Sequence, residues 1–250
     1  MEQPRTQFCE TSLPGFDLHR LAVTRSAEVG EHGHRQQMRD RFLRAGSEAT
    51  PDLDLLEMVL YRAIPRREVR SLAKRLLADF GDLSSVVAAS RNRLAAVQGV
   101  GTRVVHELKI IEAAGHAMAR ARVMEREVIS NWQALLSYCQ TKMAHMEREQ
   151  FRVLFLDRRN CLIDDVALQT GTVDHVPVYP REVAKTALEV NASAVILVHN
   201  HPSGDATPSA EDVAMTKQVQ AGLEVLGLTL HDHVIIGRGE TYSLRAHDLI

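Results

Sequence analysis

Two histidines and an aspartate in the C-terminal half have the spacing of a metal site built from neighbouring segments. His199 and His201 follow the apolar run 194–198, which is typical of a buried strand. Alternate side chains of an extended chain share a face, so both imidazoles can point at one ion. Turn residues then reverse the chain, and Asp212 falls in the first turn of a predicted helix, where it can supply a third ligand.

Two imidazoles and a carboxylate leave one tetrahedral position of a zinc ion open, which distinguishes catalytic from structural zinc. Water in that position has its pKa lowered toward neutrality, so a nearby carboxylate can take its proton and generate a hydroxide nucleophile. The pattern therefore predicts one Zn2+ ion and hydrolytic chemistry. A second interpretation stays open, because Ser209 and Asp212 also fit Ser-x-x-Asp, a variant of the helix capping box.

These residues resemble the JAMM (or MPN) metalloproteases and, among them, the RadC proteins. The JAMM pattern of His-x-His, seven residues, Ser, two residues and Asp is matched by His199, His201, Ser209 and Asp212. RadC proteins share the stretch His-Asn-His-Pro-Ser-Gly, followed by Pro-Ser and Asp, as residues 199–212 do. The resemblance implies zinc ligation by both histidines and Asp212, an oxyanion-stabilising Ser209, and a peptide, isopeptide or other amide as the substrate.

The general base lies outside this compact motif. In JAMM proteins it is a Glu just before the first long strand, which corresponds here to the strand predicted over 151–156. Glu149 precedes that strand and is the base that the resemblance implies, with Glu147 as a register alternative. Glu182 is a further rival, since a helix opening after Pro180 can also face the site. An acid in a first helical turn also interacts favourably with the helix dipole, and this role is favoured for Glu182.

The positions of apolar residues predict the elements around the motif. Strands are expected over 151–156, 161–169 and 228–236, besides the strand that ends at His199. Helices are expected over 180–190 and from Asp212 to near Gly227. Together with the resemblance, this predicts an α/β domain of JAMM/MPN type over residues 129–250, with a mixed sheet flanked by helices.

His231-Asp232-His233 presents a second pair of alternating histidines. The two rings would share one strand face, but no third ligand or helix start follows at useful spacing. A structural role, or a hydrogen bond that Asp232 accepts from a ligand, is therefore favoured over a second metal site.

The first half of the chain predicts a leader and a small all-α domain. Residues 1–34 show no sustained periodicity and are expected to be a flexible leader, and 35–128 contain successive short helices. Gly99 and Gly101 sit in a turn that resembles the helix-hairpin-helix motif, which RadC proteins carry upstream of the JAMM domain. Such glycines present backbone amides to a phosphate at a helix N-terminus, and Arg103 is a candidate backbone contact. DNA is thus an expected partner, with a plain packing unit as the alternative.

A cluster of basic residues lies in the same region and faces a single acid, Glu68. It is typical either of a phosphate-binding surface or of a solvated helix face, and the two interpretations weigh equally. Its members are Arg62, Arg66, Arg67, Arg70, Lys74 and Arg75.

Composition bounds the remaining classes of protein. No apolar run approaches the roughly 20 residues of a membrane span, and the N-terminus lacks the features of a signal peptide, so a cytoplasmic location is expected. Three cysteines without paired spacing predict neither disulfides nor a thiolate zinc site. A formal charge of -2 makes no global case for nucleic-acid binding. Two function classes follow: a zinc-dependent hydrolase, and a DNA-associated accessory protein whose metal site is structural or regulatory.

Overall fold

The computed structural model describes residues 33–124, 126–170 and 178–250. Contacts between Cα atoms divide the chain into two compact units, the second of which begins at Lys74. Residues 1–32 of the predicted leader lie outside the described residues. The boundary near residue 128 lies within the second unit and stays a prediction.

The N-terminal part of the described chain is helical, as predicted. Caps define two of its short helices, because the side chains of Asp82 and Ser90 each accept a hydrogen bond from an amide in the first turn. Residues 33–45 are helical and precede α2 (Asp52–Ala63), α3 (Arg70–Phe80), α4 (Leu83–Ala88), α5 (Arg91–Ala96) and α6 (Thr102–Val123). Among the described residues, no helix is long and apolar enough to cross a membrane.

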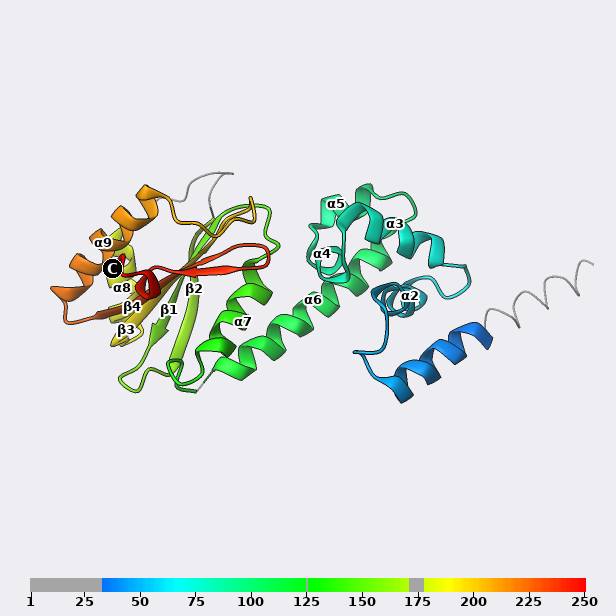
Figure 1. The fold of residues 1–250 in the computed structure, drawn as a ribbon, viewed down its shortest axis with the longest axis horizontal. Helices are drawn as coiled ribbons and strands as arrows, with labels where there is room; N and C mark the ends of the chain where they lie inside the picture. The colour runs from blue at the N-terminus through cyan, green and yellow to red at the C-terminus, as the bar shows by residue number, and fades with distance from the viewer. Residues whose placement is uncertain (1–32, 125, 171–177) are drawn as a thin grey trace, which may run out of the picture. The chain divides into compact units, whose positions relative to one another are not determined.

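The C-terminal part contains a mixed sheet in the order β2-β1-β3-β4-β5 (Figure 1). β3 and β4 are parallel, and the other neighbouring strands are antiparallel. The strands are β1 (Gln150–Leu156), β2 (Leu162–Thr170), β3 (Ala194–Asn200), β4 (Thr229–Ile236) and β5 (Thr241–Ser243), followed by a 3-10 turn, η1 (Arg245–His247). The predicted mixed sheet with flanking helices is confirmed.

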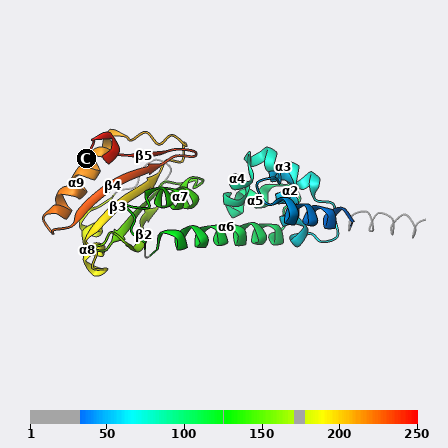
Figure 2. The ribbon, with the colours of Figure 1, turned by 60° about the horizontal axis from the view of Figure 1, so that its bottom comes forward.

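Different helices cover the two faces of the sheet (Figures 1 and 2). Apolar side chains of α7 (Trp132–Met143) pack with Leu154 and Val198 on one face. Those of α8 (Pro180–Glu189) and α9 (Ala210–Glu224) pack with Leu197 on the other. Side chains alternate along β3, so His199 lies on the face that α9 covers and Asn200 on the opposite face.

A buried carboxylate ties α7 to the sheet. The Asp165 side chain is 1% exposed and accepts hydrogen bonds from Arg152 Nε at 2.7 Å and Lys142 Nζ at 2.9 Å. The Tyr138 hydroxyl also donates to it. Burial opposes ionisation of Asp165, but these donors outweigh it and hold its pKa below the usual range. The charge is therefore paired rather than isolated, as burial requires.

Candidate metal centre

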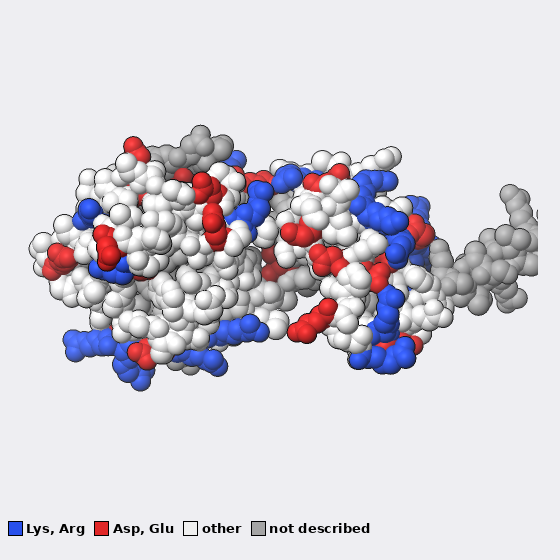
Figure 3. All heavy atoms as spheres, viewed as in Figure 1, with Lys and Arg blue, Asp and Glu red and all other residues white. Residues whose placement is uncertain are grey.

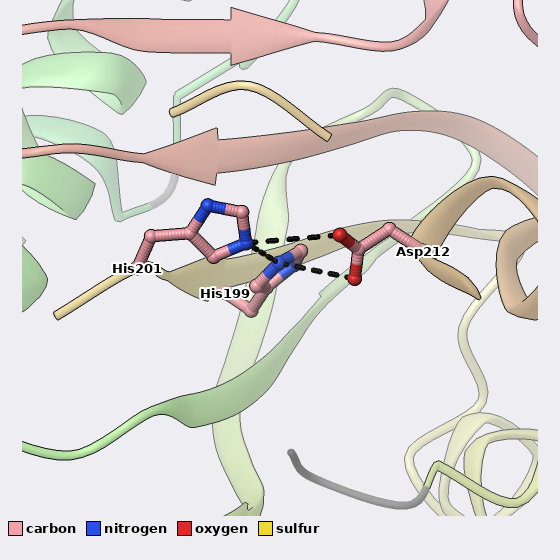
Figure 4. Close-up of side chains that lie close together, drawn as sticks. All are labelled: His199, His201 and Asp212. Atoms are coloured by element: carbon pink, nitrogen blue, oxygen red, sulfur yellow. Dashed lines mark hydrogen bonds and ion pairs between the residues drawn. The ribbon is translucent and has the colours of Figure 1, made fainter. Parts of the chain in front are cut away.

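The three predicted ligands converge at the carboxyl end of β3 (Figure 4). His199 Nε2 lies 3.0 Å from His201 Nε2 and 3.3 Å from Asp212 Oδ1, and His201 Nε2 lies 3.7 Å from Asp212 Oδ2. β3 supplies the first histidine, the turn after it the second, and the first turn of α9 the aspartate. The spacing of the motif thus becomes one cluster, in which the ligand atoms all lie within 4.8 Å of one another.

The donor set fits a zinc ion. Zn–N and Zn–O distances of about 2.0–2.2 Å at tetrahedral angles separate neighbouring ligand atoms by about 3.3 Å, close to the observed separations. Nδ1 of His201 lies 2.8 Å from the carbonyl oxygen of Asp205, which only accepts, so this nitrogen carries the proton. Nε2 of neutral His201 therefore presents a lone pair to the cluster.

Electrostatics favour the deprotonated forms of His199 and Asp212 near neutral pH. Burial lowers the pKa of His199 to about 4, so its ring is neutral. Burial opposes ionisation of Asp212, but hydrogen bonds with His201 and Ser209, and the charge that His199 gains in acid, outweigh this effect and hold the Asp212 pKa well below its usual range. The hydrogen bond with Asp212 raises the pKa of His201. Imidazole and carboxylate ligands must be deprotonated to bind a metal, and His199 and Asp212 meet this requirement near neutral pH.

Ser209 is the N-cap of α9 and completes a capping box with Asp212. The Ser209 hydroxyl accepts from the Asp212 amide at 3.1 Å, and Asp212 Oδ2 accepts from the Ser209 amide at 2.8 Å. The same hydroxyl lies 2.7 Å from Asp212 Oδ2, to which it donates. The capping interpretation is confirmed. It is compatible with the cluster, because the Asp212 carboxylate that caps α9 also lies 3.7 Å from His201 Nε2.

The turn between the histidines and α9 packs closely against the β4–β5 hairpin. The amide of His201 donates to the Ile236 carbonyl at 3.0 Å, and the Arg238 amide donates to the Gly204 carbonyl at 3.0 Å. Gly204 has φ +97°, and a Cβ on Gly237 would lie 2.4 Å from the Gly204 oxygen. Glycine is needed at both positions for the turn to hold His201 beside β4.

Glu149 immediately precedes β1 and is close enough to His201 to influence its charge. β1 and β3 are antiparallel, and their pairing ends with Phe151 opposite His199, so the residues just before β1 lie beside the end of β3. The Glu149 charge contributes to raising the pKa of His201, as a nearby carboxylate would. The buried side chain of Asn200 binds the backbone on both sides of Glu149. It accepts from the Gln150 amide at 2.9 Å and donates to the Arg148 carbonyl at 3.1 Å.

Comparison with known proteins extends the resemblance to most of the chain. Residues 129–249 match the family model described as the RadC-like JAB domain. A UPF0758 protein of Ruegeria pomeroyi is 61% identical over 213 residues, which are 85% of this chain and 95% of that protein. A UPF0758 protein of Rhodobacter capsulatus is 60% identical over 213 residues, covering 85% of this chain and 100% of that protein.

The chain belongs to the RadC family. Its RadC-like JAB domain holds the His199, His201 and Asp212 cluster, and both rivals of Glu149 are exposed. Glu147 pairs with Arg93 at 3.4 Å. Glu182 occupies the first turn of α8, the position expected for an acid that interacts with the helix dipole. Its Oε1 lies 3.3 Å from Arg181 Nε. The choice of base stays a prediction, with the geometry favouring Glu149.

The second histidine pair of this RadC chain does not share a face, so that expectation is wrong. A register shift between Val195 and Ile196 of β3 places a bulge at His231 in β4, and the side chains beyond it change faces. His231 Nε2 lies 2.7 Å from Asn160 Oδ1, whereas His233 Nε2 lies 2.8 Å from His199 Nδ1. Sequence reasoning missed His233, because a bulge leaves no signal in the alternation.

Asp232 takes the structural role that was favoured for it. Its carboxylate accepts from the amides of His233 at 2.7 Å and Arg245 at 3.0 Å, and from the Ser243 hydroxyl. It thereby joins β4 to β5 and the 3-10 turn. Among residues 33–124, 126–170 and 178–250, only the first histidine pair forms a cluster with metal-ligand spacing.

The predicted hairpin of the RadC chain joins α5 to α6. Gly99 has φ +96°, which favours glycine, and Gly101 is the N-cap of α6 without a side-chain capping bond. Arg103 is exposed in the first turn of α6. The Arg75 guanidinium of α3 donates to the Gln98 carbonyl and so links this turn to α3.

Arg70 and Arg75, two members of the basic cluster, make intramolecular contacts. Arg70 lies 3.0 Å from buried Glu57 and 3.6 Å from Asp54, and Arg75 is bound to the hairpin. Figure 3 shows Lys and Arg side chains over α3 interleaved with acidic ones. The visible face is therefore of mixed charge, which is typical of a solvated surface.

Proposed function

We propose that this protein is a zinc-dependent metallohydrolase that cleaves an amide or isopeptide bond with water. His199, His201 and Asp212 would hold one Zn2+ ion. When bound, Zn2+ would lower the pKa of water and polarise the scissile carbonyl. Ligation by these three residues leaves one tetrahedral position open, as a catalytic site requires.

Glu149 is the proposed general base. Its carboxylate accepts a proton from the attacking water, whose oxygen forms a bond to the carbonyl carbon. The carbon–nitrogen bond then breaks, and the protonated Glu149 passes the proton to the departing nitrogen, so that a carboxylic acid and an amine are released. Ser209 is the proposed donor to the developing oxyanion, which requires its hydroxyl to turn from Asp212 Oδ2 toward the substrate.

The observation that carries this proposal is the convergence of three ligands with Glu149 at one strand end. A structural or regulatory metal site in a DNA-associated protein, the second function class, needs the ligands but no carboxylate beside them at the start of β1. Such a site also tends to be closed by a fourth protein ligand. The part of the chain that the structure describes offers three residues at ligand spacing.

Replacing Glu149 with glutamine separates these classes. Glu149→Gln removes the base but no ligand, so the variant should keep its zinc and lose at least about 100-fold in turnover. The measurement is hydrolysis of a library of quenched peptides and isopeptide-linked lysine substrates by zinc-loaded full-length protein, with zinc content determined in parallel. Glu147→Gln is the matched control and should retain wild-type turnover.

Two results would contradict the assignment. Full turnover by Glu149→Gln with zinc retained would show that another group is the base. Absence of zinc-dependent hydrolysis by wild-type protein above the Glu149→Gln background would favour the accessory-protein class.

DNA binding by the hairpin is the second candidate function. The observation that favours it is the pair of glycines at the α5–α6 turn, where Gly101 brings no side-chain acceptor to the first-turn amides of α6. Such amides and the helix dipole bind a phosphate, and exposed Arg103 adds a positive charge beside them. The contact would be to the DNA backbone and independent of sequence.

A further inference from the structure

A chain of buried hydrogen bonds joins the two segments that carry the proposed ligands. His199 Nδ1 lies 2.8 Å from His233 Nε2, and His233 Nδ1 lies 2.6 Å from Thr216 Oγ1. The Thr216 hydroxyl donates in turn to the carbonyl oxygen of Asp212, one turn earlier in α9. His233 and Thr216 are fully buried, and neither belongs to the ligand set.

The direction of this chain decides where the proton of His199 lies. A hydroxyl has one hydrogen, and that of Thr216 is directed to the Asp212 carbonyl, so Thr216 Oγ1 accepts from His233 Nδ1–H. Neutral His233 then has a lone pair on Nε2 and accepts from His199 Nδ1–H. Nε2 of His199 is left without a proton, directed at His201 and Asp212.

We propose that Thr216 and His233 are positioning residues that fix His199 in the tautomer able to bind a metal. A ligating histidine commonly donates its second N–H to a carboxylate, a carbonyl or water. Here the acceptor is Nε2 of another histidine, His233. That atom keeps a lone pair because Thr216 Oγ1 accepts the proton of His233 on Nδ1. We call the hydrogen-bonded chain from Asp212 through Thr216 and His233 to His199 the relay. Phe151 stacks against His199 at 6.0 Å between ring centroids and restrains the ring that the relay orients.

Reversing the relay would disable the site. If His233 carried its proton on Nε2, it would donate to His199 Nδ1 and require the proton of neutral His199 to move to Nε2. That proton would occupy the atom that must coordinate the metal. Loss of the Thr216 hydroxyl favours this reversal, because a buried His233 Nδ1–H would have no acceptor.

Nitrogen-15 NMR of histidine-labelled, metal-free protein reads the tautomers directly. We expect proton-bearing Nδ1 and bare Nε2 for both His199 and His233 in wild type, with their signals assigned by loss in His199→Gln and His233→Gln. A wild-type spectrum with the proton on Nε2 of His199 overturns the proposal. The wild-type tautomers are read without a metal, and the variants serve only for assignment.

Substitution of Thr216 supplies the second test. Thr216→Val keeps the shape of the side chain but removes the hydroxyl, and should shift His199 toward the Nε2–H tautomer and weaken Zn2+ binding about 10–100-fold in chelator competition. Thr216→Ser restores the hydroxyl and should restore both readouts. Wild-type tautomer and affinity in a folded Thr216→Val protein would overturn the proposal.

The effect on metal affinity rests on the proposed function, whereas the proton positions do not. If wild-type protein shows the expected tautomers but binds no Zn2+, the relay stands and the metallohydrolase proposal fails. If it binds Zn2+ and Thr216→Val leaves the tautomers unchanged, the relay fails and the proposed function stands.

Discussion

Asn200 lies between two proposed ligands, yet its side chain faces away from them. Its carboxamide bonds the backbone on both sides of Glu149 and so holds the end of β3 to the start of β1. The ligands themselves were predictable, because they lie close in sequence and follow one strand. The roles of Asn200 and His233 were not, since their partners are 50 and 34 positions away, respectively.

Asn200→Ala should separate catalysis from metal binding. The variant keeps all three ligands, so its zinc content should equal that of wild type. Turnover should fall by about 100-fold, the effect of misplacing a reacting group by about 1 Å. The measurement is kcat on whichever substrate the wild-type protein hydrolyses.

Asn131→Ala is the matched control, because Asn131 makes no side-chain capping bond to α7. It should keep both its zinc and its turnover. Unchanged kcat in a folded Asn200→Ala protein would show that Glu149 does not depend on this contact.

At the scale of elements, the strands and helices around the site were predictable because apolar residues recur with clear periods. β3 is buried at every position, and the turn and helix signals that follow it set the start of α9. The bulge in β4 was not predictable, since it depends on how β4 pairs with β3. The anchoring of α7 through Asp165 also depends on residues that meet only in the folded sheet.

Asp165 makes the stability of the C-terminal sheet dependent on pH. Its folded-state pKa is lowered, so its contribution is fully present above its ordinary unfolded pKa of about 3.9 and is lost as pH falls through the lower folded value. Asp165→Asn should destabilise the protein by about 3–5 kcal/mol at pH 7, because Arg152 and Lys142 lose their charge partner. That difference should shrink in acid.

Urea unfolding followed by fluorescence of the single tryptophan measures this effect, since Trp132 packs against the same core. The free energies of unfolding of wild type and Asp165→Asn are compared between pH 7 and pH 3, with chelator present to remove metal effects. A difference independent of pH would contradict the assigned role of Asp165.

At the scale of the whole molecule, two compact units are joined within one helix. The division falls between Ala73 and Lys74, inside α3, whereas the predicted elements and the family resemblance placed a boundary near residue 128. Periodicity and motifs locate elements along the chain, while compactness depends on which elements pack together. The family extends beyond the JAB domain, because the relatives match 85% of the chain.

If the hairpin binds DNA, the full-length protein should bind a labelled duplex in a salt-dependent manner. Arg103→Ala should weaken binding for all sequences alike and reduce the slope of log K against log salt by about 1. Fluorescence anisotropy between about 50 and 200 mM salt provides the measurement. Arg159→Ala, in the exposed β1–β2 turn, is the control and should leave the slope unchanged. No salt-dependent binding by wild type would remove DNA as a partner.

The most direct test of the proposed metal centre is zinc stoichiometry by native mass spectrometry of the full-length protein. The three converging ligands predict one Zn2+ per wild-type chain and none for His201→Ala at equal zinc activity. His231→Ala should retain one ion, because His231 contacts Asn160 rather than the cluster. A wild-type chain without zinc, or a His201→Ala chain that binds it as tightly as wild type, would contradict the account.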